Sequence, residues 1–568
     1  MVRAAAENRH DTSPATNSPR TKISRVARRS FHPVISDPVP WDCPGAQEID
    51  FELPELYNAS EVLFKNLKNG CGDRLAVTGP SGERTYRKLC HDAAQWGNAL
   101  LSLGLMRGDR VVLLLDDTAV YPAVFFGAVR AGLVPVLVNP LTPPNELQFY
   151  LADSNAAAAV AEAGFSARFN AIACAGTRLN KLIAVNGEPR GDLAVEAKAA
   201  SSWLPFFSIR LQPAQTHRNE MAFWMYSSGS TGRPKGIVHL QHDMPYTAAS
   251  YARHVLKLTS QDLCFSVPKI FFSYGFSNSI TYPFSAGAAS ILMPGAPKPE
   301  AVFATIAKYR PTVFFGLPTL YTNLLKEPDV AGVDFSSLRL AISAAEILSS
   351  DIFQGWKQLT GLEIVEGLGS TEVQNIYLSN TVEKKKPGSA GMRVPGYELV
   401  LKDKKGNTIE GPGEGILWVR GHSSTPFYWN CPAKTAETIR EGGWLCTKDR
   451  FARDADGFHY FRGRGDDLVR VSGQWVHPVE VQSCLLEHPA VRECAVLPVE
   501  LPDLRMTLKA FVVLKHPPAN TQKAARELQD YVKSRLLPYK YPRIISFLPE
   551  LPKMASGKVD RQALLTLR

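Results

Sequence analysis

Short apolar runs alternate with amphipathic segments along most of the chain. Residues 111–115 and 134–138 are apolar and rich in β-branched side chains, which predicts two buried strands. Residues 120–131, between them, have the length and pattern of a helix. Strands that alternate with helices predict a parallel sheet covered on both faces, and therefore the α/β class.

The same alternation continues on both sides of this unit. One helix is expected to open at residues 62–64 and another to run from 85 to 101. Further strands are predicted at residues 221–226, 313–315, 340–342, 363–365 and 416–419. The stretch 447–464 reads as turn-rich. Since ligands of such sheets gather at the carboxyl ends of strands, the residues that follow these runs are candidates for a site.

After Asp466 the pattern starts afresh. Strands are predicted at 468–471, 495–497 and 510–514, and helices at 479–486 and 523–537, which is a small α+β unit. A chain of 568 residues is too long for one compact core. We therefore expect a disordered basic tail at residues 1–40, a large domain at 41–465 and a small domain at 466–568.

The tail carries much of the charge. The first 33 residues hold seven Arg or Lys and two Asp or Glu, which supplies half of the net charge of +10. An arginine-rich leader is typical of mitochondrial transit peptides, but Glu7, Asp11 and the lack of an amphipathic stripe favour a plain tail. The remaining positive charge is mild and does not demand nucleic acid.

Cysteine usage and hydropathy narrow the class of protein further. The nine cysteines are scattered without C-x-x-C pairs, which predicts reduced thiols rather than disulfides or a zinc site. The most apolar stretch, 111–138, is interrupted by Asp116, Asp117, Arg130 and Pro135, so no transmembrane run is present. We expect a cytoplasmic protein with neither a nucleic-acid nor a membrane partner.

A Gly/Ser-rich loop follows the predicted strand 221–226. Residues 226–236 contain three glycines, four small hydroxyl residues and Lys235. Glycines let backbone N–H groups face an anion, hydroxyls add donors and a lysine adds charge, so a polyphosphate is the expected ligand. The P-loop of NTPases is excluded, because Gly236 rather than Ser or Thr follows the lysine. A solvated loop is the plain alternative.

This loop resembles the phosphate loop of the adenylate-forming superfamily, which comprises acyl-CoA synthetases, peptide-synthetase adenylation domains and luciferases. Six further segments match that superfamily in the expected order and span about residues 57–561. The resemblance implies a large multi-sheet N-terminal domain, a small mobile C-terminal domain, and the use of ATP, Mg²⁺ and CoA.

Residues 366–372, Glu-Gly-Leu-Gly-Ser-Thr-Glu, follow a predicted strand. By resemblance, the glycines lie against adenine, Thr371 reaches a phosphate and Glu372 holds Mg²⁺. Leu368 stands where the family commonly has tyrosine. Read alone, Ser-Thr-Glu is equally typical of a helix cap.

Asp449 is placed to accept both ribose hydroxyls, and Arg464 resembles a second contact to ribose and phosphate. Lys448 replaces a family glycine, so the local backbone is expected to differ. Surface charges are the plain alternative for both residues. The resemblance implies that the ATP-binding residues are Ser227, Ser228, Gly229, Ser230, Thr231, Gly232, Lys235, Ala345, Glu346, Gly367, Leu368, Gly369, Thr371, Asp449, Arg464 and Lys558.

The small domain is expected to supply the hinge, the adenylation lysine and the CoA-binding loop. Asp466 matches the hinge about which that domain rotates in the family. Lys558, on a Ser-Gly turn, matches the adenylation lysine, although an isolated lysine there would simply be solvated. Lys558, Lys235, Thr371 and Glu372 are thus the catalytic candidates. The residues that resemble the CoA-binding loop are Arg470, Ser472, Gly473, Gln474 and Trp475.

Residues 268–278, 310–321 and 370–380 resemble the benzoate–CoA ligase branch. By that match the acid pocket is lined by Phe272, Ser273, Tyr274, Gly275, Leu368 and Asn375. Aromatic and aliphatic walls suit a flat aryl acid, whereas a plain hydrophobic core explains the aromatics equally well. Ser273 and Asn375 stand where benzoate ligases tend to have alanine and histidine, so the hypothesis is a benzoate with a hydroxyl or amino group.

The function that follows is an AMP-forming ligase that makes an aryl-CoA. The alternatives are a stand-alone module that loads a carrier protein or an amine, or a CoA ligase for a cinnamic or fatty acid. The oligomeric state, monomer or homodimer, stays open.

Overall fold

The structure is a computed structural model that describes residues 34–567, apart from 37–38, 228–233, 328–331, 345–347, 465–468, 472–473, 502–505, 537–539 and 555–557. The side chains of residues 470, 471, 474 and 475 also lie outside this description.

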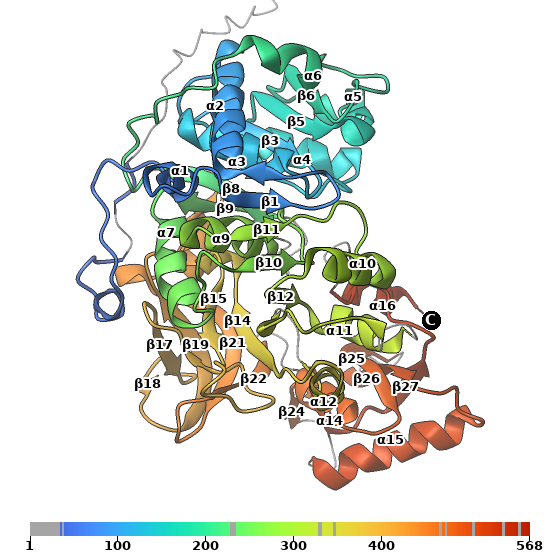
Figure 1. The fold of residues 1–568 in the computed structure, drawn as a ribbon. Helices are drawn as coiled ribbons and strands as arrows, with labels where there is room; N and C mark the ends of the chain where they lie inside the picture. Colours follow the sequence, from blue (N-terminus) through green and yellow to red (C-terminus); the bar gives the residue numbers. More distant parts are fainter. Residues whose placement is uncertain are drawn as a thin grey trace, which may run out of the picture. The chain divides into compact units, whose positions relative to one another are not determined.

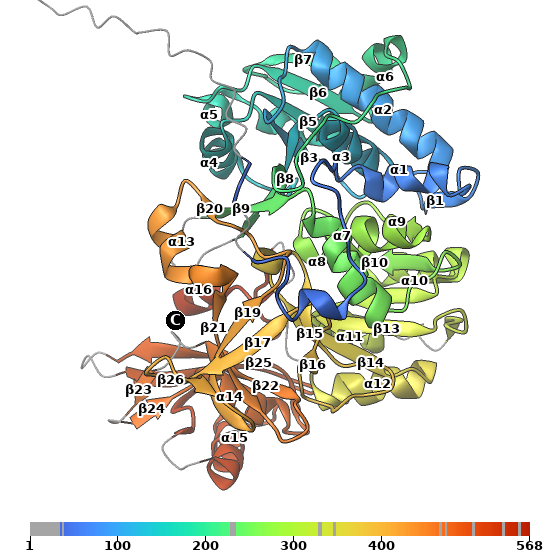
Figure 2. The ribbon, with the colours of Figure 1, turned by 90° about the vertical axis from the view of Figure 1, so that its left-hand side faces the viewer.

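One sheet of eight strands is built by the alternating pattern of the first half of the chain. Its strands run in the spatial order β20 (Tyr428–Trp429), β9 (Lys235–Leu240), β8 (Met221–Ser227), β4 (Val134–Leu137), β3 (Arg110–Leu114), β5 (Ala158–Glu162), β6 (Lys181–Val185) and β7 (Glu196–Ala199). From β8 to β7 all neighbours are parallel, whereas β9 and β20 are added antiparallel. Helix α2 (Tyr86–Ser102) lies on one side, and α4 (Pro144–Ser154) and α5 (Ala171–Cys174) lie on the other (Figure 2). The predicted strands and helices of this unit are confirmed.

A second sheet of nine strands holds the middle of the chain. Its spatial order is β16 (Met392–Arg393), β15 (Ile376–Ser379), β14 (Ile364–Gly369), β13 (Leu340–Ala344), β12 (Val313–Gly316), β10 (Leu263–Ser266), β11 (Ala289–Ile291), β1 (Leu75–Thr78) and β2 (Arg84–Thr85). The strands from β1 to β14 are parallel, so their carboxyl ends lie at one edge. The crossover helices α10 (Pro299–Tyr309), α11 (Pro318–Lys326) and α12 (Ser350–Thr360) follow one another beside it (Figure 1).

A third, antiparallel sheet corrects one prediction. It has the order β18 (Thr408–Ile409), β17 (Glu398–Lys402), β19 (Gly413–Arg420), β21 (Leu445–Arg453) and β22 (His459–Arg464). The stretch 447–464 is therefore mostly a hairpin of two strands rather than turns. Its residues are largely charged and only partly buried, which conceals the apolar alternation of a strand.

The last hundred residues form small sheets with their own apolar clusters. These elements are β23 (Val469–Val471), β24 (Gln474–Val476), α14 (Pro478–Leu486), β25 (Val491–Glu500), β26 (Met506–Leu514), α15 (Thr521–Arg535), β27 (Ile544–Phe547) and α16 (Arg561–Thr566). Both clusters contain only residues from 469 onward. The domain boundaries at residues 40 and 465 stay predictions.

The remaining helices lie mainly in the first half of the chain. They are α1 (Glu61–Lys68), α3 (Val120–Arg130), α6 (Ala200–Trp203), α7 (Asp243–Thr247), α8 (Ser273–Phe276), α9 (Tyr282–Ala286) and α13 (Pro432–Thr438). Among the described residues, no helix combines the length and the apolar character needed to cross a bilayer. All nine cysteines are unpaired thiols.

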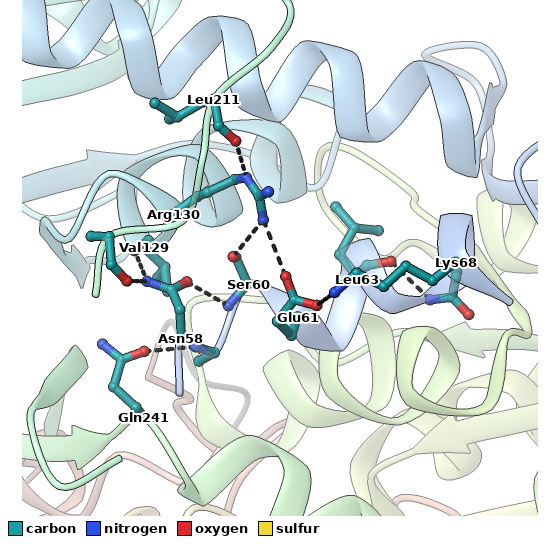
Figure 3. A network of polar contacts seen from close by, with 12 residues as sticks. Asn58, Ser60, Glu61, Leu63, Lys68, Val129, Arg130, Leu211 and Gln241 are labelled. Atoms are coloured by element: carbon teal, nitrogen blue, oxygen red, sulfur yellow. Dashed lines mark hydrogen bonds and ion pairs between the residues drawn. The ribbon is translucent and has the colours of Figure 1, made fainter. Parts of the chain in front are cut away.

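Buried polar contacts fix the segment before α1 against the first sheet (Figure 3). The Asn58 amide donates to the Val129 carbonyl at 3.0 Å. The guanidinium of Arg130 donates to the Leu211 carbonyl at 2.6 Å and approaches Glu61 at 3.4 Å. Because a buried guanidinium is costly unless paired, this network favours a single arrangement of α1 and α3.

Candidate functional site

Two strand ends bracket the Gly/Ser-rich loop. Strand β8 ends at Ser227, β9 begins at Lys235, and these two residues are register partners. Residues Ser228, Gly229, Ser230, Thr231 and Gly232 lie outside the described residues. A side chain at Gly236 would come within 3.2 Å of Trp429, so glycine permits the close pairing of β9 with β20.

Lys235 and Glu372, far apart in sequence, meet in the structure. The Lys235 ammonium lies 3.5 Å from Oε1 of Glu372, and both side chains are more than four-fifths buried. The same carboxylate oxygen accepts a hydrogen bond of 2.9 Å from the Tyr428 hydroxyl. The ammonium lies 4.2 Å from the centre of the Tyr428 ring. The predicted phosphate lysine and the predicted metal carboxylate therefore form one cluster.

The glycines of the 366–372 motif lie on β14, beside the end of β13. Gly367 pairs with Ala344, so Ala345 and Glu346, which lie outside the described residues, follow directly after the neighbouring strand. A Cβ atom at Gly369 would stand 2.0 Å from the Asn375 carbonyl oxygen, so only glycine fits there. Leu368 is partly buried against the second core cluster. Thr371 and Glu372 open a short 3-10 helix, Thr371–Val373.

Asp449 and Arg464 form the second pair that the sequence predicts. They are register partners on β21 and β22, and the guanidinium reaches the carboxylate at 3.4 Å. Lys448 has a φ of +61°, in the left-handed region that favours glycine. A lysine thus holds a backbone conformation that a glycine adopts at no cost. The expected difference in the backbone at Lys448 stays a prediction.

Tyr377 connects the two clusters. Burial is the main cause that raises the pKa of its hydroxyl. The charges of Asp449 and Glu372 raise this pKa further and that of Arg464 lowers it. The predicted ribose and metal contacts are therefore close enough to act on one phenol.

The donor set fits a metal that is shared with a nucleotide. Burial raises the pKa of Glu366 to about 8, so this carboxyl is largely protonated near neutral pH. Glu372, the other carboxyl of the motif, pairs with Lys235. Among the described residues, no group of three or more His, Cys, Asp or Glu side chains could hold a metal ion. Mg²⁺ bound by one carboxylate and by substrate phosphates matches this composition.

The predicted acid-binding residues come from two parts of the chain, the beginning of α8 with the residue before it, and the end of β14 with the segment that follows. Phe272 packs against the first core cluster, and Tyr274 and Leu368 pack against the second. The ring of Tyr274 meets that of Phe315, at the end of β12, edge to face with centroids 6.4 Å apart. Ser273 is partly exposed at the start of α8.

Asn375 differs from the other pocket candidates, because its side-chain amide is buried. The residue is 2% exposed. Neither its amide nitrogen nor its amide oxygen has a hydrogen-bond partner among the described residues. A buried, unpaired amide costs about 1–3 kcal/mol, which a hydrogen-bonding ligand group would offset.

Gly275 gives a direct test of the acid loop. A Cβ atom there would lie 2.1 Å from the Lys269 carbonyl oxygen and 2.3 Å from that of Pro268, both backbone atoms. We expect Gly275→Ala to displace this loop and to lower kcat/KM for the acid by about tenfold or more, whereas ATP affinity measured by calorimetry changes less than twofold. In the control Gly164→Ala the added methyl meets no atom within 4 Å. Equal kinetics in the two variants would contradict the placement of the loop.

Several predicted residues of the small domain are only partly visible. Asp466, Ser472 and Gly473 lie outside the described residues, as do the side chains of Arg470, Gln474 and Trp475. Lys558 is exposed, and its carbonyl accepts a hydrogen bond of 2.8 Å from the Met554 N–H. Among the described residues, its ammonium has no hydrogen bond or ion pair with Lys235 or Glu372. Its catalytic role stays a prediction.

Sequence reasoning missed the aromatic partners of this site. Tyr428 and Tyr377 contact or face the predicted charged groups, and the N–H of Thr425 donates to the Glu372 carbonyl at 2.6 Å. The aromatic triplet 427–429 was the available signal.

Comparisons with known proteins identify the family of the chain. Residues 63–429 match the family described as AMP-binding enzyme, and residues 480–558 match the AMP-binding enzyme C-terminal domain. The chain is 37% identical over 513 residues to a benzoate–CoA ligase of Thauera aromatica, covering 90% of this chain and 96% of that protein.

Two solved structures share both fold and sequence. The anthranilate CoA ligase AuaEII in complex with anthranoyl-AMP has a TM-score of 0.84 at 37% identity, over 90% of this chain and 97% of that one. A benzoate CoA ligase from Burkholderia xenovorans has a TM-score of 0.81 at 36% identity, over 90% of this chain and all of that one. With the family matched over most of its length, and the lysine, glutamate, aspartate and arginine gathered as described, the chain belongs to the AMP-binding enzyme family.

Proposed function

We propose that this protein is an AMP-forming ligase that joins an aromatic carboxylic acid to CoA, with ATP as the energy source. The observation that carries the proposal is that Lys235, Glu372 and Tyr428 form one cluster and Asp449 and Arg464 form a pair, with the charges of Glu372, Asp449 and Arg464 all acting on Tyr377. The similarity to benzoate and anthranilate CoA ligases supports an aryl acid.

In the first step an oxygen of the acid attacks the α-phosphorus of ATP, and pyrophosphate leaves. A carboxylate and a triphosphate repel each other, so the step needs positive charge and alignment. Lys235 supplies charge at the phosphates, and Lys558 is assigned to the carboxylate and α-phosphate. Mg²⁺, held by Glu372, would neutralise phosphate charge. Asp449 and Arg464 orient the ribose.

In the second step the CoA thiol attacks the acyl carbonyl of the acyl-adenylate. The bond between the carbonyl carbon and the phosphate oxygen breaks, and AMP leaves with one oxygen of the original acid. We assign the approach of CoA to Arg470, Ser472, Gly473, Gln474 and Trp475. Rotation about Asp466 would remove Lys558 and bring this loop in, so that one site serves both steps and limits loss of the adenylate to water.

The acid is proposed to be a benzoate with a hydroxyl or amino substituent. The pocket candidates Phe272, Tyr274 and Leu368 offer flat apolar walls. Asn375 contributes a buried amide without a partner among the described residues, and Ser273 contributes a hydroxyl. Both could bond to a polar substituent on the ring.

This specificity gives a second prediction. We expect Asn375→Ala to reduce the preference for a hydroxy- or aminobenzoate over benzoate by about tenfold, the value of one lost hydrogen bond in a buried site, and Ser273→Ala to reduce it less, because Ser273 is partly exposed. Ratios of kcat/KM for the paired acids give the preference. Ser102→Ala, on helix α2, removes a hydroxyl far from this pocket and serves as the control. An unchanged ratio in both pocket variants would contradict the assignment.

The function itself is tested with a panel of acids. Pyrophosphate and AMP release would be measured with benzoic, hydroxybenzoic, aminobenzoic, cinnamic and medium-chain fatty acids, with and without CoA. Turnover with an aryl acid and formation of its CoA thioester are the expected results. Pyrophosphate release without any thioester would favour the alternative, a module that loads a carrier protein or an amine. Preference for a fatty acid would overturn the assignment of the acid.

A further inference from the structure

Tyr428 lies next to the strand that begins with Lys235. It belongs to β20, the edge strand beside β9 (Figure 2), and its backbone pairs with Ile237. Its backbone N–H donates to the Thr435 hydroxyl oxygen at 3.0 Å, and the residue is 3% exposed. Its position is therefore set by contacts that do not involve the nucleotide site.

From this fixed position, Tyr428 contacts both Glu372 and Lys235, the two charged residues assigned to Mg²⁺ and the phosphates. Its hydroxyl donates to Oε1 of Glu372 at 2.9 Å, and its ring lies under the Lys235 ammonium at 4.2 Å. The same segment also holds the Glu372 backbone, through the 2.6 Å hydrogen bond from the Thr425 N–H. Residues 425–428 thus contact both the main chain and the side chain of Glu372, the residue assigned to the metal.

The ion pair alone would not fix these two groups. At 3.5 Å, the contact between Lys235 and Glu372 has little directional preference, and both side chains rotate about several bonds. A phenol hydrogen bond to a carboxylate is directional, and it occupies one oxygen while leaving the other for a metal. A ring face beneath an ammonium limits where that ammonium can go.

We propose that Tyr428 is a positioning residue for the nucleotide half-reaction, which holds the Glu372 carboxylate and the Lys235 ammonium in place before ATP and Mg²⁺ bind. The inference rests on the proposed function, because it concerns the step in which the acid is adenylated. Groups that are aligned before the reaction need no reorganisation during it, so this residue affects the affinity for the nucleotide–metal complex and the rate of adenylation.

Two substitutions separate the parts of this role. Tyr428→Phe removes the hydrogen bond but keeps the ring beneath Lys235, and Tyr428→Leu removes both. Tyr86→Phe is the matched control, because the Tyr86 hydroxyl is equally buried and donates to the Ala288 carbonyl at 2.5 Å, within the first core cluster. The thermal unfolding of the three variants would be compared first, since a loss of one buried hydrogen bond is common to both phenylalanine variants.

Binding of ATP with and without Mg²⁺ would then be measured by calorimetry, without acid. We expect Tyr428→Phe to weaken binding of the ATP–Mg²⁺ complex by about tenfold, Tyr428→Leu to weaken it further, and Tyr86→Phe to leave it unchanged. The titration of pyrophosphate formation with Mg²⁺ should shift in the same order, while thioester formation from supplied aryl-adenylate stays within about twofold.

The outcomes are distinct. Unaltered ATP–Mg²⁺ binding and an unaltered Mg²⁺ titration in Tyr428→Phe would overturn the inference. The hydroxyl would then have no positioning role, and the residue would serve only through the packing of its ring. A loss of the same size in Tyr86→Phe would overturn it too. If the wild-type protein binds ATP and Mg²⁺ but none of the aryl acids supports pyrophosphate formation, the proposed function fails. The comparison of ATP–Mg²⁺ binding still decides the role of Tyr428 in that case.

Discussion

Replacing Lys558 by alanine is expected to lower acid-dependent pyrophosphate formation by about 10²–10³-fold, while ATP binding falls much less. The ammonium is assigned to the oxygens between which charge develops when the acid attacks the α-phosphorus, and loss of one such group costs about this much in rate. In the second half-reaction the same residue has no assigned part. Conversion of supplied aryl-adenylate to aryl-CoA should therefore stay within about twofold of the wild-type rate.

A control residue lies five positions before Lys558 in the sequence. Lys553 is part of the same C-terminal segment and pairs with Glu493 at 3.1 Å, so Lys553→Ala removes an equal charge without touching the assigned role. If Lys558→Ala behaves like Lys553→Ala in the first half-reaction, or if both half-reactions fall equally, the assignment of Lys558 is wrong.

Glu372→Gln is expected to have the second largest effect. The substitution keeps the size of the side chain and an oxygen that can accept from Tyr428, but removes the charge that faces Lys235 and the metal. We expect kcat/KM for the ATP–Mg²⁺ complex to fall by about 10²-fold or more, with a higher requirement for Mg²⁺. Initial rates at varied Mg²⁺ and fixed ATP would measure both changes.

The control for this charge lies on the other side of strand β14, which separates it from Glu372 in the sequence. Glu363, just before β14, forms ion pairs with Lys357 at 2.7 Å and with Lys385 on the surface. Glu363→Gln should leave the Mg²⁺ titration unchanged. A Glu372→Gln variant with a normal Mg²⁺ requirement would show that the carboxylate does not serve the metal, and a deficit matched by Glu363→Gln would point to stability instead.

The apolar core of the fold was predictable because its strands are short and almost wholly buried. The runs at β4 and β12 are apolar throughout, and those at β3 and β13 contain one polar residue each, so composition identifies them. Strands β21 and β22 were missed, since their partly exposed faces carry charged residues, and only pairing with neighbours makes them strands.

The charged residues of the site were predictable for a different reason. Lys235, Glu372, Asp449 and Arg464 lie in segments whose residue types resemble a known family, so no long-range contact had to be inferred. Tyr428 was not found, because its role depends on the pairing of β20 with β9, across almost two hundred residues of sequence. A buried tyrosine in an aromatic triplet looks like core until its hydroxyl is seen to reach a carboxylate.

The central claim is that the acid itself attacks the α-phosphorus of ATP. The most direct measurement uses an aryl acid labelled with ¹⁸O in both carboxylate oxygens, incubated with ATP, Mg²⁺, CoA and the full-length protein, followed by mass spectrometry of the nucleotide. One labelled oxygen is predicted to appear in AMP and one to remain in the aryl-CoA carbonyl. Unlabelled AMP, or label in inorganic phosphate alongside ADP, would contradict the account.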